Sequence, residues 1–121
     1  MVSDVQPLNR RVGEVLESLE QVIAARKGGD PERSYTARLL AGGVAAAGAK
    51  VTEEAGELVR AAAGESGDRV VAEAADLVYH TLVLLACRDV PLGRVEDELG
   101  RRFGVSGLAE KAARTAAGGG R

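Results

Sequence analysis

Apolar residues recur at helical spacing along most of the chain, and no segment alternates in the way of a half-buried strand. In the first part they lie three and four residues apart, which predicts an amphipathic helix from Val5 to about Lys27. The turn sequence Gly28-Gly29-Asp30-Pro31 ends it. A long segment without proline then predicts a second helix from Tyr35 to about Ala63, with Ser34 as its N-cap.

The second predicted helix carries glycines at positions 42, 43, 48 and 56. Each of them costs about 1 kcal/mol relative to Ala in an exposed helix. So many glycines predict either a break near Gly42-Gly43 or a close approach of another backbone. The apolar face of this helix is expected to consist of Leu40, Val44, Val51, Leu58 and Ala62.

The remaining pattern predicts further helices separated by short turns. In chain order we expect a loop at 64–68 with Asp68 as N-cap, a helix from Arg69 to about Arg88, a helix from about Leu92 to Phe103, a turn at 104–107 and a short helix from Leu108 to Thr115. The fold class is therefore all-α, a four- to five-helix bundle in a single domain over residues 1–115, followed by a mobile tail over residues 116–121.

Composition adds an expectation about partners. Aromatic residues make up 2% of the 121-residue chain, so the core must be built from Ala, Val, Leu and Ile, and a subunit partner would help to bury them. The net charge of -2 gives no reason to expect nucleic acid or an anionic membrane as partner. The lone Cys87 and the short apolar run from Leu82 to Cys87 fit a cytoplasmic protein without a membrane span.

Two acidic clusters, one on each central helix, carry the chemical information. On the second helix Lys50, Glu53, Glu54 and Glu57 share one side. The third helix is apolar nearly all round, except for one narrow stripe that contains Arg69, Glu73, Asp76 and His80. Carboxylates side by side in a low-dielectric place repel and protonate unless a cation lies between them.

The composition of these clusters selects the ion. Joined together, they offer up to five carboxylates and no thiolate, and such oxygen ligands favour Mg²⁺ first and Mn²⁺ second. A zinc site would need more Cys or His, and a di-iron bundle would need Glu-x-x-His pairs. Mg²⁺ held by carboxylates most often serves phosphate chemistry.

Glu53-Glu54-x-x-Glu57, a gap of fifteen residues and Glu73-x-x-Asp76 together resemble the signature of the all-α, MazG-like nucleoside triphosphate pyrophosphohydrolases. Within that superfamily the chain is similar to the phosphoribosyl-ATP pyrophosphohydrolase family. The more specific parts of the resemblance are Ser34-Tyr35-Thr36 and the segment from Asp76 to His80. The resemblance extends from about Leu16 to Arg114.

The resemblance implies Mg²⁺-dependent hydrolysis of phosphoribosyl-ATP to phosphoribosyl-AMP and pyrophosphate in histidine biosynthesis. It also implies a homodimer or a higher assembly of dimers. The residues that match the family's metal ligands are Glu54, Glu57, Glu73 and Asp76. Glu53 and Glu54 are the candidate catalytic residues, Glu53 as a further ligand or as the base that orients water. The candidate substrate-binding residues are Ser34, Thr36, Arg38, Lys50 and His80, of which Arg38 and Lys50 are placed to meet phosphate oxygens.

Other interpretations of the same residues stay open at this point. The chain could be a housekeeping pyrophosphohydrolase of NTPs or dUTP, or a non-catalytic helical dimerisation module. The glutamates of the second helix could be a solvated face paired with Lys50. Asp76 could be an interior acid paired with Arg69 or Arg88, and His80 could be structural.

Overall fold

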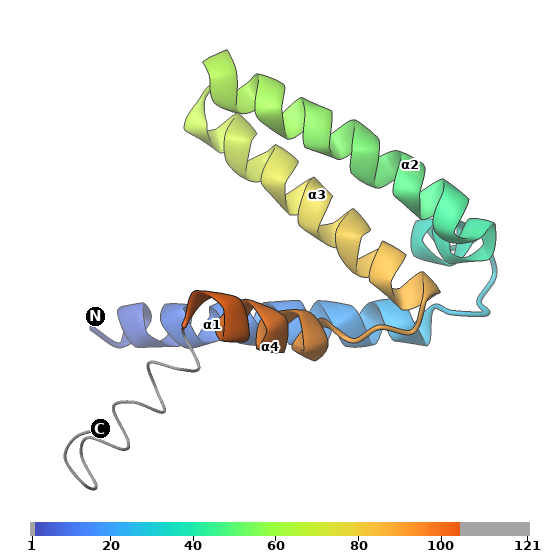
Figure 1. Cartoon of the computed structure of the whole chain (residues 1–121), viewed down its shortest axis with the longest axis horizontal. Coiled ribbons are helices and arrows are strands. Elements are labelled where there is room, and N and C mark those ends of the chain that lie inside the picture. Colours follow the sequence, from blue (N-terminus) through green and yellow to red (C-terminus); the bar gives the residue numbers. More distant parts are fainter. Residues whose placement is uncertain (1, 105–121) are drawn as a thin grey trace, which may run out of the picture. The chain divides into compact units, whose positions relative to one another are not determined.

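The computed structural model describes residues 2–104, with side chains from residue 13 onward, and the described part is helical. It contains α1 (Val2–Ala25), α2 (Tyr35–Gly64), α3 (Gly67–Cys87) and α4 (Leu92–Phe103), and no strand (Figure 1). The predicted all-α class is confirmed. The predicted short helix from Leu108 to Thr115 and the predicted tail lie outside the described residues.

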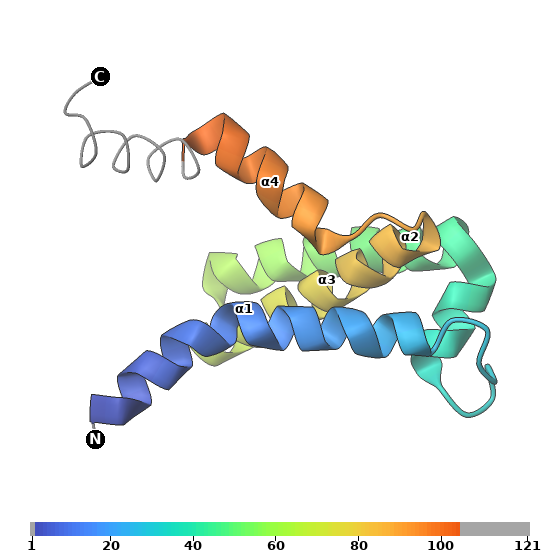
Figure 2. The same ribbon diagram turned by 90° about the horizontal axis from the view of Figure 1, so that it is seen from below.

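The chain divides into two compact units, Met1–Val90 and Pro91–Arg121. The first unit contains α1, α2 and α3, and the second contains α4. In the first unit α2 and α3 lie side by side and run in opposite directions, and α1 packs against α3 (Figures 1 and 2). The single domain expected over residues 1–115 stays a prediction.

Helix α2 begins at the predicted cap and breaks at the predicted glycines. The Ser34 hydroxyl oxygen accepts a hydrogen bond from the backbone N–H of Ala37 at 3.0 Å. Gly43 has φ 71° and ψ -160°, a conformation that essentially only glycine adopts. A Cβ added there would meet nothing within 4 Å, so backbone conformation rather than crowding requires the glycine. The part of α2 before Gly43 runs in a different direction from the rest (Figure 1).

The predicted N-cap of α3 was wrong by two residues. Ser66, not Asp68, has the extended backbone of a cap, and its hydroxyl accepts from the backbone N–H of Arg69 at 3.3 Å. The helix therefore begins at Gly67, and Asp68 lies in its first turn, where a carboxylate interacts favourably with the helix dipole.

Aliphatic residues alone make up the buried apolar core in the part of the chain that the structure describes. The buried apolar residues are Ile23, Ala37, Leu39, Ala47, Ala61, Leu82 and Val83. Of the face predicted for α2, Leu40, Val51 and Leu58 are half-buried, whereas Ala62 is exposed and Val44 is 50% exposed. The side of α2 that is buried instead carries Ala47, Glu54 and Ala61 at intervals of seven residues, so a carboxylate lies in the middle of the packed face.

Much of the apolar surface of α2 and α3 stays exposed in the single chain. Val59 and Val71 are each 68% exposed, and Val78 is 42% exposed. By length and composition α3 is also apolar enough to cross a membrane, a property that core helices of soluble proteins share. Its buried Glu73 and His80 argue for a protein-covered position, since charged groups are expensive at the centre of a bilayer.

Helix α4, considered by itself, has the bounds that the sequence predicted. It starts after Pro91 and ends at Gly104, which takes the left-handed conformation typical of a C-cap. Arg101 and Arg102 in its last turn both pair with Glu98, at 2.5 and 2.7 Å. These two bonds lower the pKa of Glu98 and place the cations where the helix dipole favours them.

Candidate metal centre between two helices

Three carboxylates from two helices converge in the first unit. Glu54 and Glu57 come from α2 and Glu73 comes from α3, and one oxygen of each lies within 4.8 Å of the others. Glu54 is 6% exposed and Glu73 is 4% exposed, whereas Glu57 is half-buried. The burial of Glu54 excludes the solvated-face interpretation for this residue.

Each of the two buried carboxylates has one oxygen held and one oxygen unpaired. Arg69 binds Glu73 Oε2, and Lys50 Nζ lies 3.8 Å from Glu54 Oε2. The other oxygens, Glu54 Oε1 and Glu73 Oε1, are buried and have no hydrogen-bond donor. An unpaired buried oxygen of a charged group is expensive, so this geometry is suited to a bound cation.

The charges in the cluster affect the protonation of its third member. The pKa of Glu57 is raised, because its carboxyl lies close to that of Glu73 and is repelled by the Glu73 charge. Carboxylates this close repel each other unless a proton or a cation lies between them. Three carboxylates and no sulfur or imidazole form a donor set for a hard cation such as Mg²⁺.

Two of the predicted acidic residues lie outside this group of three. Glu53 is half exposed and accepts a hydrogen bond from Lys50 at 3.2 Å, which also raises the pKa of the lysine. The Asp76 side chain is exposed. The alternative that pairs Asp76 with Arg69 finds no support, because Arg69 contacts Glu65 and Glu73 instead.

His80 joins the start of α2 to α3. The ring is buried, Nδ1 lies 2.8 Å from the carbonyl oxygen of Asp76, and Nε2 lies 2.9 Å from the Tyr35 hydroxyl. Because a carbonyl can only accept, Nδ1 carries the proton, and in the neutral ring Nε2 accepts from Tyr35. Both ring nitrogens are thus bonded within the chain, and contact of His80 with the substrate stays a prediction.

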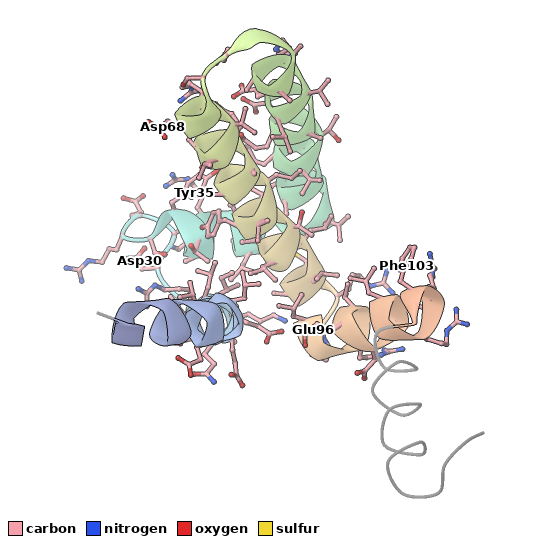
Figure 3. All side chains as sticks on the ribbon, turned by 90° about the vertical axis from the view of Figure 1, so that its left-hand side faces the viewer. Asp30, Tyr35, Asp68, Glu96 and Phe103 are labelled. Carbon is pink, nitrogen blue, oxygen red and sulfur yellow. The ribbon has the colours of Figure 1, made fainter. Side chains whose placement is uncertain are left out.

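A second side-chain hydrogen bond, beside that of Tyr35 with His80, also joins the start of α2 to α3. Thr36 Oγ1 is bonded to the Tyr79 hydroxyl, and the Tyr35 and Tyr79 rings stack with centroids 6.3 Å apart. We call Tyr35, Thr36, Tyr79 and His80 the tyrosine-histidine clasp. It ties the segment before the Gly43 break to α3 (Figure 3 labels Tyr35).

The clasp also fixes the neighbourhood of the predicted phosphate-binding residues. The Arg38 guanidinium lies over the Tyr35 ring, 5.3 Å from its centroid, and donates to the Pro31 carbonyl at 3.2 Å. Ser34 caps α2, as its structural interpretation predicted.

A model of the phosphoribosyl-ATP pyrophosphohydrolase family matches residues 16–103, which is most of the chain and includes the carboxylate cluster and the clasp. The chain belongs to this family.

Curated relatives agree with the family assignment over nearly their whole length. A phosphoribosyl-ATP pyrophosphatase of Trichlorobacter lovleyi is 54% identical over 83% of this chain and 93% of the relative. Proteins of the same name from Pelobacter propionicus and Caulobacter sp. are 52% and 55% identical, each over 84% of this chain and 94% of the relative.

Three residues that contact the predicted site residues were not among the candidates from the sequence, namely Arg69, Tyr35 and Tyr79. The spacing of four between Arg69 and Glu73 was visible as an ion pair on one helix. The contacts of the two tyrosines were not visible, because they join residues 43 and 45 positions apart in the chain.

Replacing Tyr35 by Phe tests whether the clasp stabilises the fold. The change leaves the ring but removes the hydroxyl, so His80 Nε2 loses its donor, and we expect a loss of about 1–3 kcal/mol in the free energy of unfolding. Chemical denaturation followed by circular dichroism measures it. Arg38→Gln is the matched control, because it removes a cation from the same ring and keeps the hydrogen bond, at an expected cost of about 0.5–1 kcal/mol. Equal effects of the two changes would contradict the assignment.

Proposed function

We propose that this chain hydrolyses phosphoribosyl-ATP to phosphoribosyl-AMP and pyrophosphate, the step of histidine biosynthesis for which its relatives are named. The observation that supports this most is that Glu54 and Glu73, which converge with Glu57, each have a buried carboxylate oxygen without a donor, Oε1 in both cases. Such a charge arrangement suits a divalent cation that accompanies a phosphate chain.

Glu54, Glu57 and Glu73 would hold Mg²⁺, or Mn²⁺ as a second choice. We assign Asp76 as a fourth ligand because it follows Glu73 by three residues on the same stripe of α3. Held by these residues, the ion would supply positive charge to offset that of the phosphate chain and of the leaving pyrophosphate.

The other residues bind the substrate and direct the water. The reaction breaks the anhydride bond between the α- and β-phosphates, and the oxygen of water forms the new bond to phosphorus. Lys50, whose raised pKa keeps it cationic, and Arg38 bind phosphate oxygens. Glu53 accepts a proton from the water, since its exposed carboxylate lies beside Glu54 but outside the three ligands. Ser34 and Thr36 lie at the start of α2 as further phosphate contacts.

The proposal includes a dimer in the cytoplasm. The exposed valines of α2 and α3 and the shortage of large buried side chains support a second copy as cover for these helices. Sedimentation equilibrium should give a mass of about twice, or a higher even multiple of, the 12.5 kDa of one chain. A monomer at micromolar concentration contradicts this part of the proposal.

The decisive assay measures pyrophosphate release from phosphoribosyl-ATP, dUTP and dCTP in parallel, each with Mg²⁺ and with chelator. We expect release from phosphoribosyl-ATP with Mg²⁺ and little in any other arm. Preference for dUTP or dCTP would favour the housekeeping pyrophosphohydrolase instead. No release from any of the three substrates would favour the non-catalytic dimerisation module.

A further inference from the structure

The two buried carboxylates have cations at matching positions, although they lie on different helices. Each has a cation four residues earlier on its own helix, Lys50 before Glu54 and Arg69 before Glu73. In both cases the cation lies nearest to Oε2, at 3.8 Å for Lys50 and within hydrogen-bonding distance for Arg69, and Oε1 is buried without a donor. The repetition suggests a common purpose, which is to fix which oxygen of each carboxylate faces the neighbouring acids.

Both the backbone and the guanidinium of Arg69 are hydrogen-bonded. Its backbone N–H donates to the Ser66 hydroxyl at 3.3 Å, the hydrogen bond that caps the start of α3. Its guanidinium Nε donates to Glu65 at 3.4 Å, while NH2 binds Glu73 Oε2. The fork of the guanidinium thus connects an exposed glutamate to a buried one, and its orientation determines that of the buried carboxylate.

The place of Arg69 in α3 is unfavourable for the helix alone. It occupies the first turn, where the helix dipole favours anions and disfavours cations. Asp68 beside it meets that preference, whereas Arg69 opposes it. The benefit of the arginine must therefore come from its contacts with Glu65 and Glu73, of which only the second reaches the carboxylate cluster.

We propose that Arg69 is a positioning residue for the metal centre. It holds Glu73 Oε2 so that Oε1 stays turned towards Glu54 and Glu57, ready to bind a divalent ion. This inference rests on the proposed function, because it assumes that the three carboxylates bind a metal. Outer partners of metal-binding residues typically contribute about 10- to 100-fold to metal affinity.

Two effects of the Arg69 charge oppose each other, and exposure decides between them. A nearby cation repels the incoming ion, which alone would weaken metal binding. The Arg69 side chain is 55% exposed, so water screens this repulsion, whereas the Glu73 side chain is 6% exposed and keeps the orientation it is given. Positioning therefore outweighs repulsion, and loss of Arg69 weakens the affinity for the ion.

The test compares the Mn²⁺ affinity of Arg69→Met with that of the unmodified protein, by electron paramagnetic resonance titration of free Mn²⁺. We expect the dissociation constant to rise about tenfold or more. Arg69→Lys should recover part of the loss, since Lys50 serves the equivalent role on α2. Helicity by circular dichroism checks that each variant folds.

Arg60→Met is the matched control for charge. Arg60 is exposed, and its charge lowers the pKa of Glu57, so it acts on the cluster through its charge. Its removal lessens repulsion of the ion, and Mn²⁺ affinity should stay equal or rise, which is opposite to the effect at Arg69. The same affinity change in both variants would overturn the positioning role.

Glu73→Gln separates the failure of this inference from failure of the metal centre. If the unmodified protein binds Mn²⁺ and Glu73→Gln abolishes binding, but Arg69→Met binds as tightly as before, only the role of Arg69 is overturned. If the unmodified protein binds no Mn²⁺, the proposed metal centre is wrong, and the inference falls with it.

Discussion

Replacing Glu54 by Gln is expected to lower pyrophosphate release from phosphoribosyl-ATP by more than about 100-fold. Loss of a residue that only supports a metal ligand costs up to about 100-fold, and Glu54 is proposed to bind the metal directly. The amide keeps the shape of the side chain but carries no charge for the cation. A continuous assay coupled to pyrophosphate, run at saturating Mg²⁺, measures the change.

The same substitution should leave the metal-free fold at least as stable as before. Glu54 is buried beside two other carboxylates, and its removal relieves their repulsion. Glu96→Gln is the matched control, an identical change at an exposed position of α4 that is expected to affect neither activity nor melting temperature (Figure 3). Full turnover by Glu54→Gln would remove this residue from the metal centre.

Asp76→Asn tests whether an exposed ligand behaves differently from a buried one. As a proposed fourth ligand Asp76 should be needed for turnover, yet its exposed side chain in the single chain is not among the crowded acids. We therefore expect lost activity without the gain in metal-free stability that Glu54→Gln brings. Full activity of Asp76→Asn would reduce the ligand set to the three glutamates.

Gly43→Ala is expected to destabilise the fold. Gly43 has φ 71° and ψ -160°, and a side chain in that region costs about 1–3 kcal/mol. Each kcal/mol corresponds to about 4–8 °C in melting temperature for a unit of this size. Activity should also fall, because the segment that carries Thr36 and Arg38 precedes this residue. Thermal melts followed by circular dichroism, together with the pyrophosphate assay, measure both effects.

Gly48→Ala provides the contrast within the same helix. Gly48 lies in regular helix, and an added Cβ would meet nothing within 4 Å. We expect this change to stabilise the protein by about 0.5–1 kcal/mol, as Ala does for Gly in a helix. If both alanines stabilised the protein, the break at Gly43 would not be a feature of the folded chain in solution.

The sequence by itself determined the helices and the acids they carry. Periodicity and turn residues placed the described helices, the Ser34 cap and the break near Gly43, because caps, glycines and helical spacing are local properties of the chain. The acid motif with the Ser34-Tyr35-Thr36 segment also indicated the family, because it is a pattern of residue types. The cap of α3 was missed because Ser and Asp are both good N-cap residues. In the structure the Ser66 hydroxyl accepts from the backbone N–H of Arg69, which makes Ser66 the cap.

Only the tertiary structure decided which side of each helix is packed and which acids meet. A hydrophobic pattern favours the face of Val44, yet the close contact of α2 with α3 needs the small side chains of Ala47 and Ala61, and this buries Glu54. The convergence of Glu54, Glu57 and Glu73, and the contact of Tyr35 with His80, join positions distant in the chain. Such meetings depend on how two helices cross, which no local pattern specifies.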